Sequence, residues 1–177
     1  DSYSKDNFKE GSRPSSNGAW LIANSYGTKY NDGGYFWLSY EEPSISDIYT
    51  MAVETTANYE NIYQYDGNGW SDAVSIPGND FTGANVFTSS SSFEETLNAV
   101  SFYTISDNQK YTIKIYKNLT GTTPDTGTLA SACTISGTAD YSGYHTIKLP
   151  TSCTLSPGSK FAVAITYKYD ASTKNQA

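Results

Sequence analysis

The chain has 177 residues, a formal net charge of -7 and a pI of about 4.5. An acidic surface repels phosphate backbones, which excludes nucleic acid as a partner. No apolar stretch reaches the roughly 18 residues of a membrane-spanning helix, so we expect no membrane span. Tyr is abundant at 16 residues while charged residues make up only 16%. Because Tyr and Thr suit pleated sheets, this composition indicates a secreted or cell-surface β-protein.

The first third of the chain alternates polar and aromatic stretches. Residues 1–18 are polar and predict a loop, and a short apolar run follows at Ala19–Ala23. A turn around residues 31–34 leads into an aromatic strand, Gly34–Tyr40, which ends before Pro43 because proline cannot donate to a sheet ladder. Residues Ile45–Thr55 read as another strand and Thr55–Glu60 as a linker.

The rest of the chain alternates short strands with turns. In Lys110–Lys117, Tyr111, Ile113 and Ile115 share one face, a period of two residues that indicates a strand. No amphipathic stretch reaches the roughly 12 residues that a stable helix needs. The pattern predicts a mainly β chain that ends in a jelly-roll-like antiparallel β-sandwich. The predicted strands are Ile62–Tyr65, Asn98–Thr104, Lys110–Lys117, Thr128–Ile135, Tyr144–Leu149 and Lys160–Tyr167.

The most informative motif begins at Trp20. The sequence from there to Phe36 is W-L-I-A-N-S-Y-G-T-K-Y-N-D-G-G-Y-F. It resembles the pattern W-x-x-x-N-S-W-G-x-x-W-G-x-x-G-Y, which surrounds the triad asparagine of papain-like cysteine peptidases. The positions that agree with this pattern are Trp20, Asn24, Ser25, Gly27, Gly34 and Tyr35.

The resemblance implies a role for Asn24. In papain-like enzymes a cysteine thiolate attacks the scissile carbonyl, a histidine moves the proton, and the asparagine orients that histidine. Tyr26 stands where the family has a tryptophan that shields the His–Asn hydrogen bond from water. It departs from the pattern, as do Tyr30 and Asn31, which replace a second Trp and a Gly.

The nucleophile and the base of such an enzyme are missing. No Cys or His precedes Asn24, and the single histidine, His145, lies within a β-pattern far downstream. We therefore expect an upstream peptidase segment that carries Cys and His as the partner, and a protein or peptide as the substrate. By itself the chain should be inactive. A plain aromatic hairpin is the alternative interpretation of the motif.

The second half resembles the lectin-like domain that follows the peptidase in some bacterial papain-family surface proteins. The runs that carry this resemblance are V-S-F-Y from Val100, Y-T-I-K-I-Y from Tyr111, G-Y-H-T-I-K-L from Gly143 and L-S-P-G-S-K-F-A-V from Leu155. We expect residues 1–57 to be the C-terminal β-portion of a papain-like domain and residues 58–177 the lectin-like module. That module usually continues further, which would leave a final strand missing.

Two kinds of ligand are conceivable for the second half. Aromatic faces bind sugars, so Trp70 and Tyr141 are predicted glycan contacts, and Tyr63, Tyr65 and Tyr144 are available as well. The alternative interpretation is that most of these aromatics are core or sheet-surface residues. Three oxygen ligands in a glycine-rich turn, Asp66, Asn68 and Asp72, suit structural calcium. The turn fails the EF-hand pattern, and turn chemistry is an equal explanation. No other cofactor is expected.

Three functional hypotheses follow. The first is a piece of a secreted papain-like endopeptidase with an accessory lectin-like module. The second is a non-catalytic carbohydrate-binding or adhesive β-sandwich, bound to a cell wall or another glycan. The third is a processed chain that stays docked to its partner.

Cys133 and Cys153 leave a further choice open, between a disulfide worth about 3 kcal/mol in the chain-entropy model and two buried thiols.

Overall fold

The computed structural model describes residues 2–46, 48–65, 67, 72–73 and 78–169. The chain divides into two compact units, Asp1–Tyr59 and Glu60–Ala177. The described residues contain no helix that is long and apolar enough to cross a membrane.

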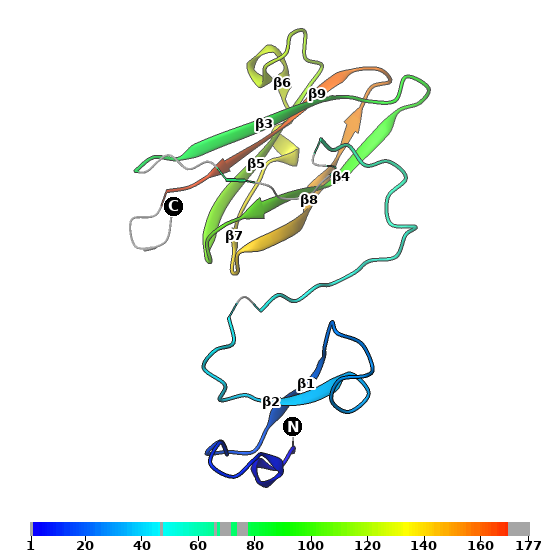
Figure 1. The fold of residues 1–177 in the computed structure, drawn as a ribbon. Coiled ribbons are helices and arrows are strands. Elements are labelled where there is room, and N and C mark those ends of the chain that lie inside the picture. Colours follow the sequence, from blue (N-terminus) through cyan, green and yellow to red (C-terminus); the bar gives the residue numbers. More distant parts are fainter. Residues whose placement is uncertain (1, 47, 66, 68–71, 74–77, 170–177) are drawn as a thin grey trace. The chain divides into compact units, whose positions relative to one another are not determined.

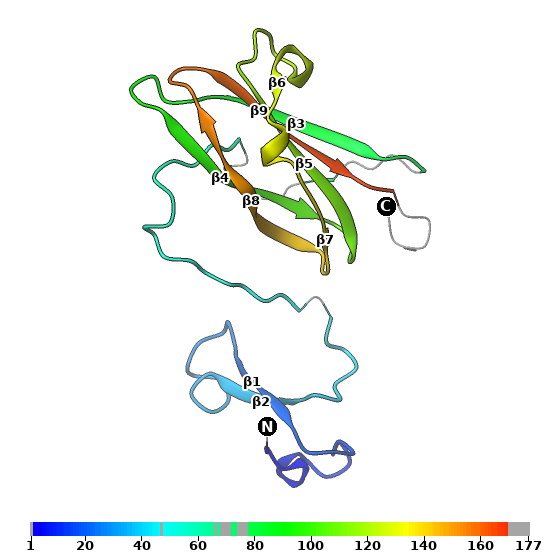
Figure 2. The ribbon, with the colours of Figure 1, turned by 180° about the vertical axis from the view of Figure 1, so that it is seen from behind.

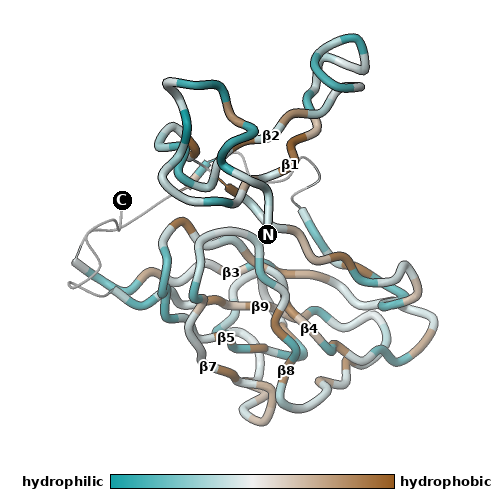
Figure 3. Tube along the Cα trace, turned by 90° about the horizontal axis from the view of Figure 1, so that it is seen from below, coloured by the Kyte–Doolittle hydropathy of each residue, from teal (hydrophilic) through white to brown (hydrophobic). Residues whose placement is uncertain are grey.

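The first unit is built on one antiparallel hairpin. After the short 3-10 turn η1 (Lys5–Asn7), strand β1 (Ala19–Ala23) pairs with β2 (Tyr35–Ser39). The predicted aromatic strand Gly34–Tyr40 is confirmed to within one residue at each end. Figure 3 shows hydrophobic residues along both strands of this hairpin.

The predicted strand Ile45–Thr55 is wrong. Residues 45, 46 and 48–55 have no strand structure, although the stretch is rich in strand-forming side chains. Large apolar residues such as Ile48, Met51 and Val53 are exposed there. A strand needs a neighbour that satisfies its backbone N–H and C=O groups, and the structure records no such pairing for the described part of this stretch.

The second unit is a two-layer β-sandwich. One sheet has the order β3-β9-β5-β6, with β7 also paired to β5, and the other sheet is the pair β4-β8; all pairings are antiparallel (Figures 1 and 2). This confirms the predicted fold class. The strands are β3 (Phe81–Thr88), β4 (Glu95–Thr104), β5 (Gln109–Lys117), β6 (Thr128–Leu129), β7 (Ile135–Ala139), β8 (Gly143–Leu155) and β9 (Lys160–Tyr167), and the 3-10 turns are η2 (Pro124–Thr126) and η3 (Ser131–Cys133).

The core lies between the two sheets and follows the period-two pattern. Strand β5 contributes Tyr111, Ile113 and Ile115, all buried, as the alternation predicted. Strand β4 faces them with Val100 and Phe102, which are also buried. Strand β9 lies centrally in its sheet, and even its small residues Ala162 and Ala164 are buried. Burial of these side chains is the main driving force for folding of the unit.

Two further predicted strands differ from the structure. Ile62–Tyr65 has no strand structure. Side-chain hydrogen bonds attach this segment to the sandwich instead. The Tyr63 hydroxyl donates to Glu95 Oε2 at 2.5 Å, and the Tyr65 hydroxyl donates to the carbonyl of Val86 at 2.5 Å. Thr128–Ile135 is not one strand. It is broken into β6, η3 and the start of β7, because the 3-10 turn interrupts the ladder between two pairings with β5 that run in the same direction.

Candidate functional site

Asn24 directly follows β1 and is held in a defined orientation. Its N–H donates to the carbonyl of Gly34 at 2.8 Å, which extends the hairpin by one bond. Its side-chain Oδ1 accepts from the N–H of Tyr26 at 2.9 Å, forming an Asx turn. Its Nδ2 is buried and has no hydrogen-bond partner among the residues that the structure describes. Because buried polar groups are nearly always paired, the unpaired Nδ2 is an exception among the described side chains.

The glycines of the motif shape the loop that carries Asn24. Gly27 and Gly34 have φ of 89° and 95°, in the left-handed region that favours glycine. A Cβ at Gly34 would lie 3.3 Å from the carbonyl oxygen of Gly27, so the two segments approach closely. The N–H of Gly34 also donates to the carbonyl of Tyr30 at 2.9 Å. The motif glycines are therefore needed to fold the loop back onto Asn24.

Tyr26 is 78% exposed and lies against Tyr30, with ring centroids 5.9 Å apart in an edge-to-face arrangement. The aromatic positions of the motif thus form a pair beside the Asx turn. Whether Tyr26 shields a His–Asn hydrogen bond stays a prediction, because the imidazole in question would belong to another segment.

Both faces of the β1-β2 hairpin carry large apolar side chains. On one face Trp20, 50% exposed, meets Tyr40 edge to face at 4.8 Å. On the other, Trp37, 40% exposed, stacks on Tyr3 at 4.1 Å. An antiparallel pair that faced water on one side would alternate apolar and polar residues. This hairpin instead has the pattern of one that is covered on both faces.

The polar loop before β1 is fixed by one carboxylate. Glu41 accepts hydrogen bonds from the N–H and the hydroxyl of Ser15 and from the N–H and the hydroxyl of Ser16. These bonds, led by that from the Ser16 hydroxyl, lower the pKa of Glu41 to about 2. Glu41 was not among the sequence-predicted site residues, since nothing in the sequence indicates which hydroxyls a surface carboxylate will meet.

His145 lies on β8, half-buried in the sandwich. Its Nε2 lies 3.0 Å from the Thr104 hydroxyl, and its ring lies 5.8 Å from that of Phe102. This confirms the expectation that the single histidine is a partly buried strand residue. The His145 side chain therefore contributes a hydrogen bond and a ring contact within the sandwich.

Most of the predicted calcium turn lies outside the described residues. This holds for Asp66 and Asn68, whereas Asp72 accepts a hydrogen bond at Oδ1 from the N–H of Ala73 at 2.7 Å. Among the described residues no group of three or more His, Cys, Asp or Glu side chains could hold a metal ion. A structural calcium at this turn stays a prediction.

The predicted glycan-contact residues differ in what the structure shows of them. The Tyr63 and Tyr65 rings pack on Phe87, at 5.9 and 5.0 Å between ring centroids, although Tyr65 remains 67% exposed. Trp70 lies outside the described residues. Tyr141 is 77% exposed and Tyr144 is 60% exposed.

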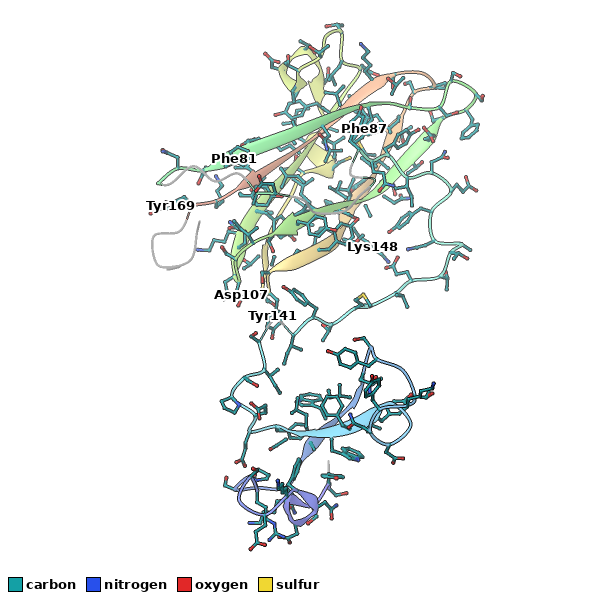
Figure 4. All side chains as sticks on the ribbon, viewed as in Figure 1. Phe81, Phe87, Asp107, Tyr141, Lys148 and Tyr169 are labelled. Atoms are coloured by element: carbon teal, nitrogen blue, oxygen red, sulfur yellow. The ribbon has the colours of Figure 1, made fainter. Side chains whose placement is uncertain are left out.

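These exposed tyrosines lie at one end of the sandwich, close to the turns that follow β4 and β7. The N–H of Ser142 donates to Asp107 Oδ1 at 2.7 Å and ties the two turns together, and Figure 4 shows Asp107 and Tyr141 at this end. Tyr144 pairs across the ladder with Tyr103, whose ring lies 4.8 Å away. The sequence reasoning missed Tyr103, because a cross-strand neighbour becomes visible only once the register is known.

The comparisons with known proteins agree with both units. No curated protein matches the chain. A variant of the clostridial cysteine protease Cwp84, solved after propeptide cleavage, is 31% identical with a TM-score of 0.66 over 99% of this chain and 42% of that one. The structure of the cysteine protease and lectin-like domains of Cwp84, a surface-layer-associated protein of Clostridium difficile, is 32% identical with a TM-score of 0.65 over 99% and 38%.

The chain therefore spans less than half the length of these two solved structures. Within the sandwich unit, the family described as "Lectin like domain" matches residues 62–176, which is more than half of the chain. The described part of these residues forms the antiparallel sandwich. The chain belongs to the lectin-like domain family.

Proposed function

We propose that the chain is part of a secreted or cell-surface papain-like cysteine endopeptidase. Residues 1–57 would supply Asn24 to the active site, and the lectin-like module would tether the enzyme or present its substrate. The nucleophilic cysteine and the histidine would come from an upstream segment. The observation that carries the proposal is that Asn24, in a loop of papain-like sequence, is held in one orientation by the bond from the N–H of Tyr26 to its Oδ1.

The geometry of Asn24 suits the role of a histidine orienter. An amide oxygen can accept two hydrogen bonds, and the N–H of Tyr26 occupies one position on Oδ1. The other would accept the N–H of the imidazole ring nitrogen that faces away from the sulfur. That bond selects the tautomer in which the other ring nitrogen takes the proton from the thiol. Asn24 would act as a positioning residue and make no contact with the scissile bond.

The hairpin supports the same assignment. An isolated two-stranded hairpin is marginally stable in water, and this one exposes Trp20 on one face and Trp37 on the other. The upstream peptidase segment would cover these faces. The similarity to a cysteine protease extends over 99% of the chain, and so it includes the hairpin as well as the sandwich.

Co-expression with the upstream Cys- and His-bearing segment of the parent gene tests the proposal. We expect thiol-dependent peptide cleavage that Asn24→Ala lowers on the order of 100-fold in kcat, with an altered pH profile. Asn7→Ala, at an exposed position, should leave cleavage unchanged. Absence of thiol-dependent cleavage in the co-expressed pair, or full activity of Asn24→Ala, would refute the proposal.

A second candidate function is glycan binding by the sandwich, which the exposed tyrosines at one of its ends favour. Tyr103, Tyr141 and Tyr144 expose aromatic rings at the end of the sandwich that also carries Asp107, a combination that suits the apolar and hydroxyl faces of a sugar. Binding to a glycan array or to isolated cell walls should weaken in Tyr144→Ala and in Trp70→Ala. Tyr49→Ala, at an exposed site of the first unit, is the control. Equal binding by all variants, or none by the wild-type chain, would rule this function out.

A further inference from the structure

Two cysteines far apart in sequence are neighbours in the core of the sandwich. Cys133 ends η3 and Cys153 lies on β8, and both are buried in the same hydrophobic cluster. Both are thiols in the structure. Turn η3 packs against strand β8, which brings the Cys133 side chain next to the Cys153 side chain. They are the only two cysteines of the chain, so each has one intramolecular partner available.

The backbone fixes both members of the pair. The N–H of Ala130 donates to the carbonyl of Ile115 at 2.8 Å, which attaches the start of η3 to β5, and the N–H of Cys133 donates to the carbonyl of Ala130 at 2.9 Å. Cys153 is held in the β4-β8 ladder opposite Leu97. Neither cysteine lies on a loose loop, so the proximity of the two sulfurs is a property of the folded state.

We propose that Cys133 and Cys153 are a disulfide site, closed when the chain folds in the presence of a low-molecular-weight disulfide. One protein thiolate attacks the small disulfide and releases one small thiol, leaving a mixed disulfide on the protein. The second cysteine attacks that mixed disulfide and releases the other small thiol. Two electrons and two protons pass from the protein thiols to the small disulfide, and one S–S bond forms for each one consumed.

The surroundings of the pair determine when this reaction can occur. Burial raises the pKa of Cys153, and the contact with Cys133 raises it further, whereas the nearby ammonium of Lys117 opposes the shift. Since only the thiolate attacks disulfides, the folded, reduced core should react slowly. Oxidation should therefore proceed before the core closes, during folding or refolding.

The bond would constrain the turn that carries the exposed tyrosines. The loop between the two cysteines is roughly 20 residues long and contains β7, Tyr141 and Tyr144. Closing it restricts the unfolded chain and joins η3 to β8. The inference is independent of peptidase activity and of glycan binding, because it depends only on the two sulfurs.

The whole 177-residue chain, refolded with oxidised and reduced glutathione or with a reducing agent alone, provides the test. After denaturation and alkylation, the oxidised sample should carry no alkyl group, and its digest should contain one peptide pair linked through Cys133 and Cys153. Its Tm should exceed that of the reduced sample by on the order of 10 °C. The folded, reduced protein should be alkylated far more slowly than the denatured one.

The double variant Cys133→Ala with Cys153→Ala is the matched control, and its Tm should be the same in both buffers. Each single variant should also lose the redox dependence. The peptide map on the wild-type chain keeps the test valid if a variant fails to fold. Alkylation of both thiols after oxidative refolding, disulfides only between chains, or a lower Tm on oxidation would overturn the proposal.

Discussion

Ser16 donates two hydrogen bonds to the carboxylate of Glu41, from its N–H at 2.8 Å and from its hydroxyl at 2.5 Å. Ser15 adds two more, so that one carboxylate at the end of β2 holds the loop before β1. In the proposed enzyme this loop would precede the strand that positions Asn24. Glu41 therefore links the charge state of a surface group to the order of the segment beside the candidate site.

Acid should release this loop at a pH set by Glu41. Its pKa is about 2 in the folded chain and about 4.5 when unperturbed, so the folded state binds its proton less readily. The stabilisation by the carboxylate is complete above pH 4.5 and disappears as the pH falls towards 2. Hydrogen exchange of the Ser15 and Ser16 amides should therefore stay protected to well below pH 4.5.

Glu41→Gln should reduce the protection of the Ser15 and Ser16 amides at neutral pH and remove the acid transition. Glu10→Gln, at an exposed position nearby in sequence, should behave as the wild type. Amides whose protection is lost at the same pH in Glu41→Gln and in the wild type would show that another group controls the loop.

Glu95 should be important for the stability of the sandwich. It accepts hydrogen bonds from the Tyr63 hydroxyl at 2.5 Å, from Asn61 Nδ2 at 2.5 Å and from the N–H of Ser90 at 2.7 Å. Glu95→Ala leaves these donors without their acceptor, and we expect a loss of about 1–3 kcal/mol of unfolding free energy in denaturant titrations. Glu94→Ala removes an exposed neighbour and should change the unfolding free energy by less than about 0.5 kcal/mol.

Gly137 should not tolerate a methyl group. A Cβ at Gly137, in β7, would lie 2.5 Å from the hydroxyl oxygen of Tyr111 and 2.8 Å from its Cζ, and Tyr111 is buried and cannot easily move. We expect Gly137→Ala to lower stability by about 1–3 kcal/mol, measured by thermal or chemical unfolding. Gly83→Ala in β3, where the nearest atom is 3.7 Å away, is the matched control. Equal effects of the two changes would contradict this packing argument.

The two units should behave differently when they are expressed apart. Residues 60–177 contain the buried core and should unfold cooperatively by themselves. Residues 1–59 expose Trp20 and Trp37 on opposite faces of a two-stranded hairpin, so we expect them to aggregate or dimerise. Light scattering and circular dichroism on each piece test both expectations. A stable monomer of residues 1–59 would argue against an upstream segment that covers the hairpin.

Local pattern in the sequence determined which segments could be strands and which face of each would be buried. The alternation in Lys110–Lys117 correctly placed Tyr111, Ile113 and Ile115 in the core. The motif around Asn24 indicated a tight loop, and the positive φ angles of Gly27 and Gly34 provide its structural basis. Such features depend on residues that are close in sequence.

Only the tertiary structure decided how the segments pair. Ile45–Thr55 has the residues of a strand but finds no neighbour in its described part, whereas Ile62–Tyr65 is fixed through Glu95 and Phe87 without forming a ladder. The pairing of Tyr103 with Tyr144 and the meeting of Cys133 with Cys153 depend on strand register. Register is set by the competition of all strands for the same core and the same backbone hydrogen bonds, and no single segment of the sequence contains that information.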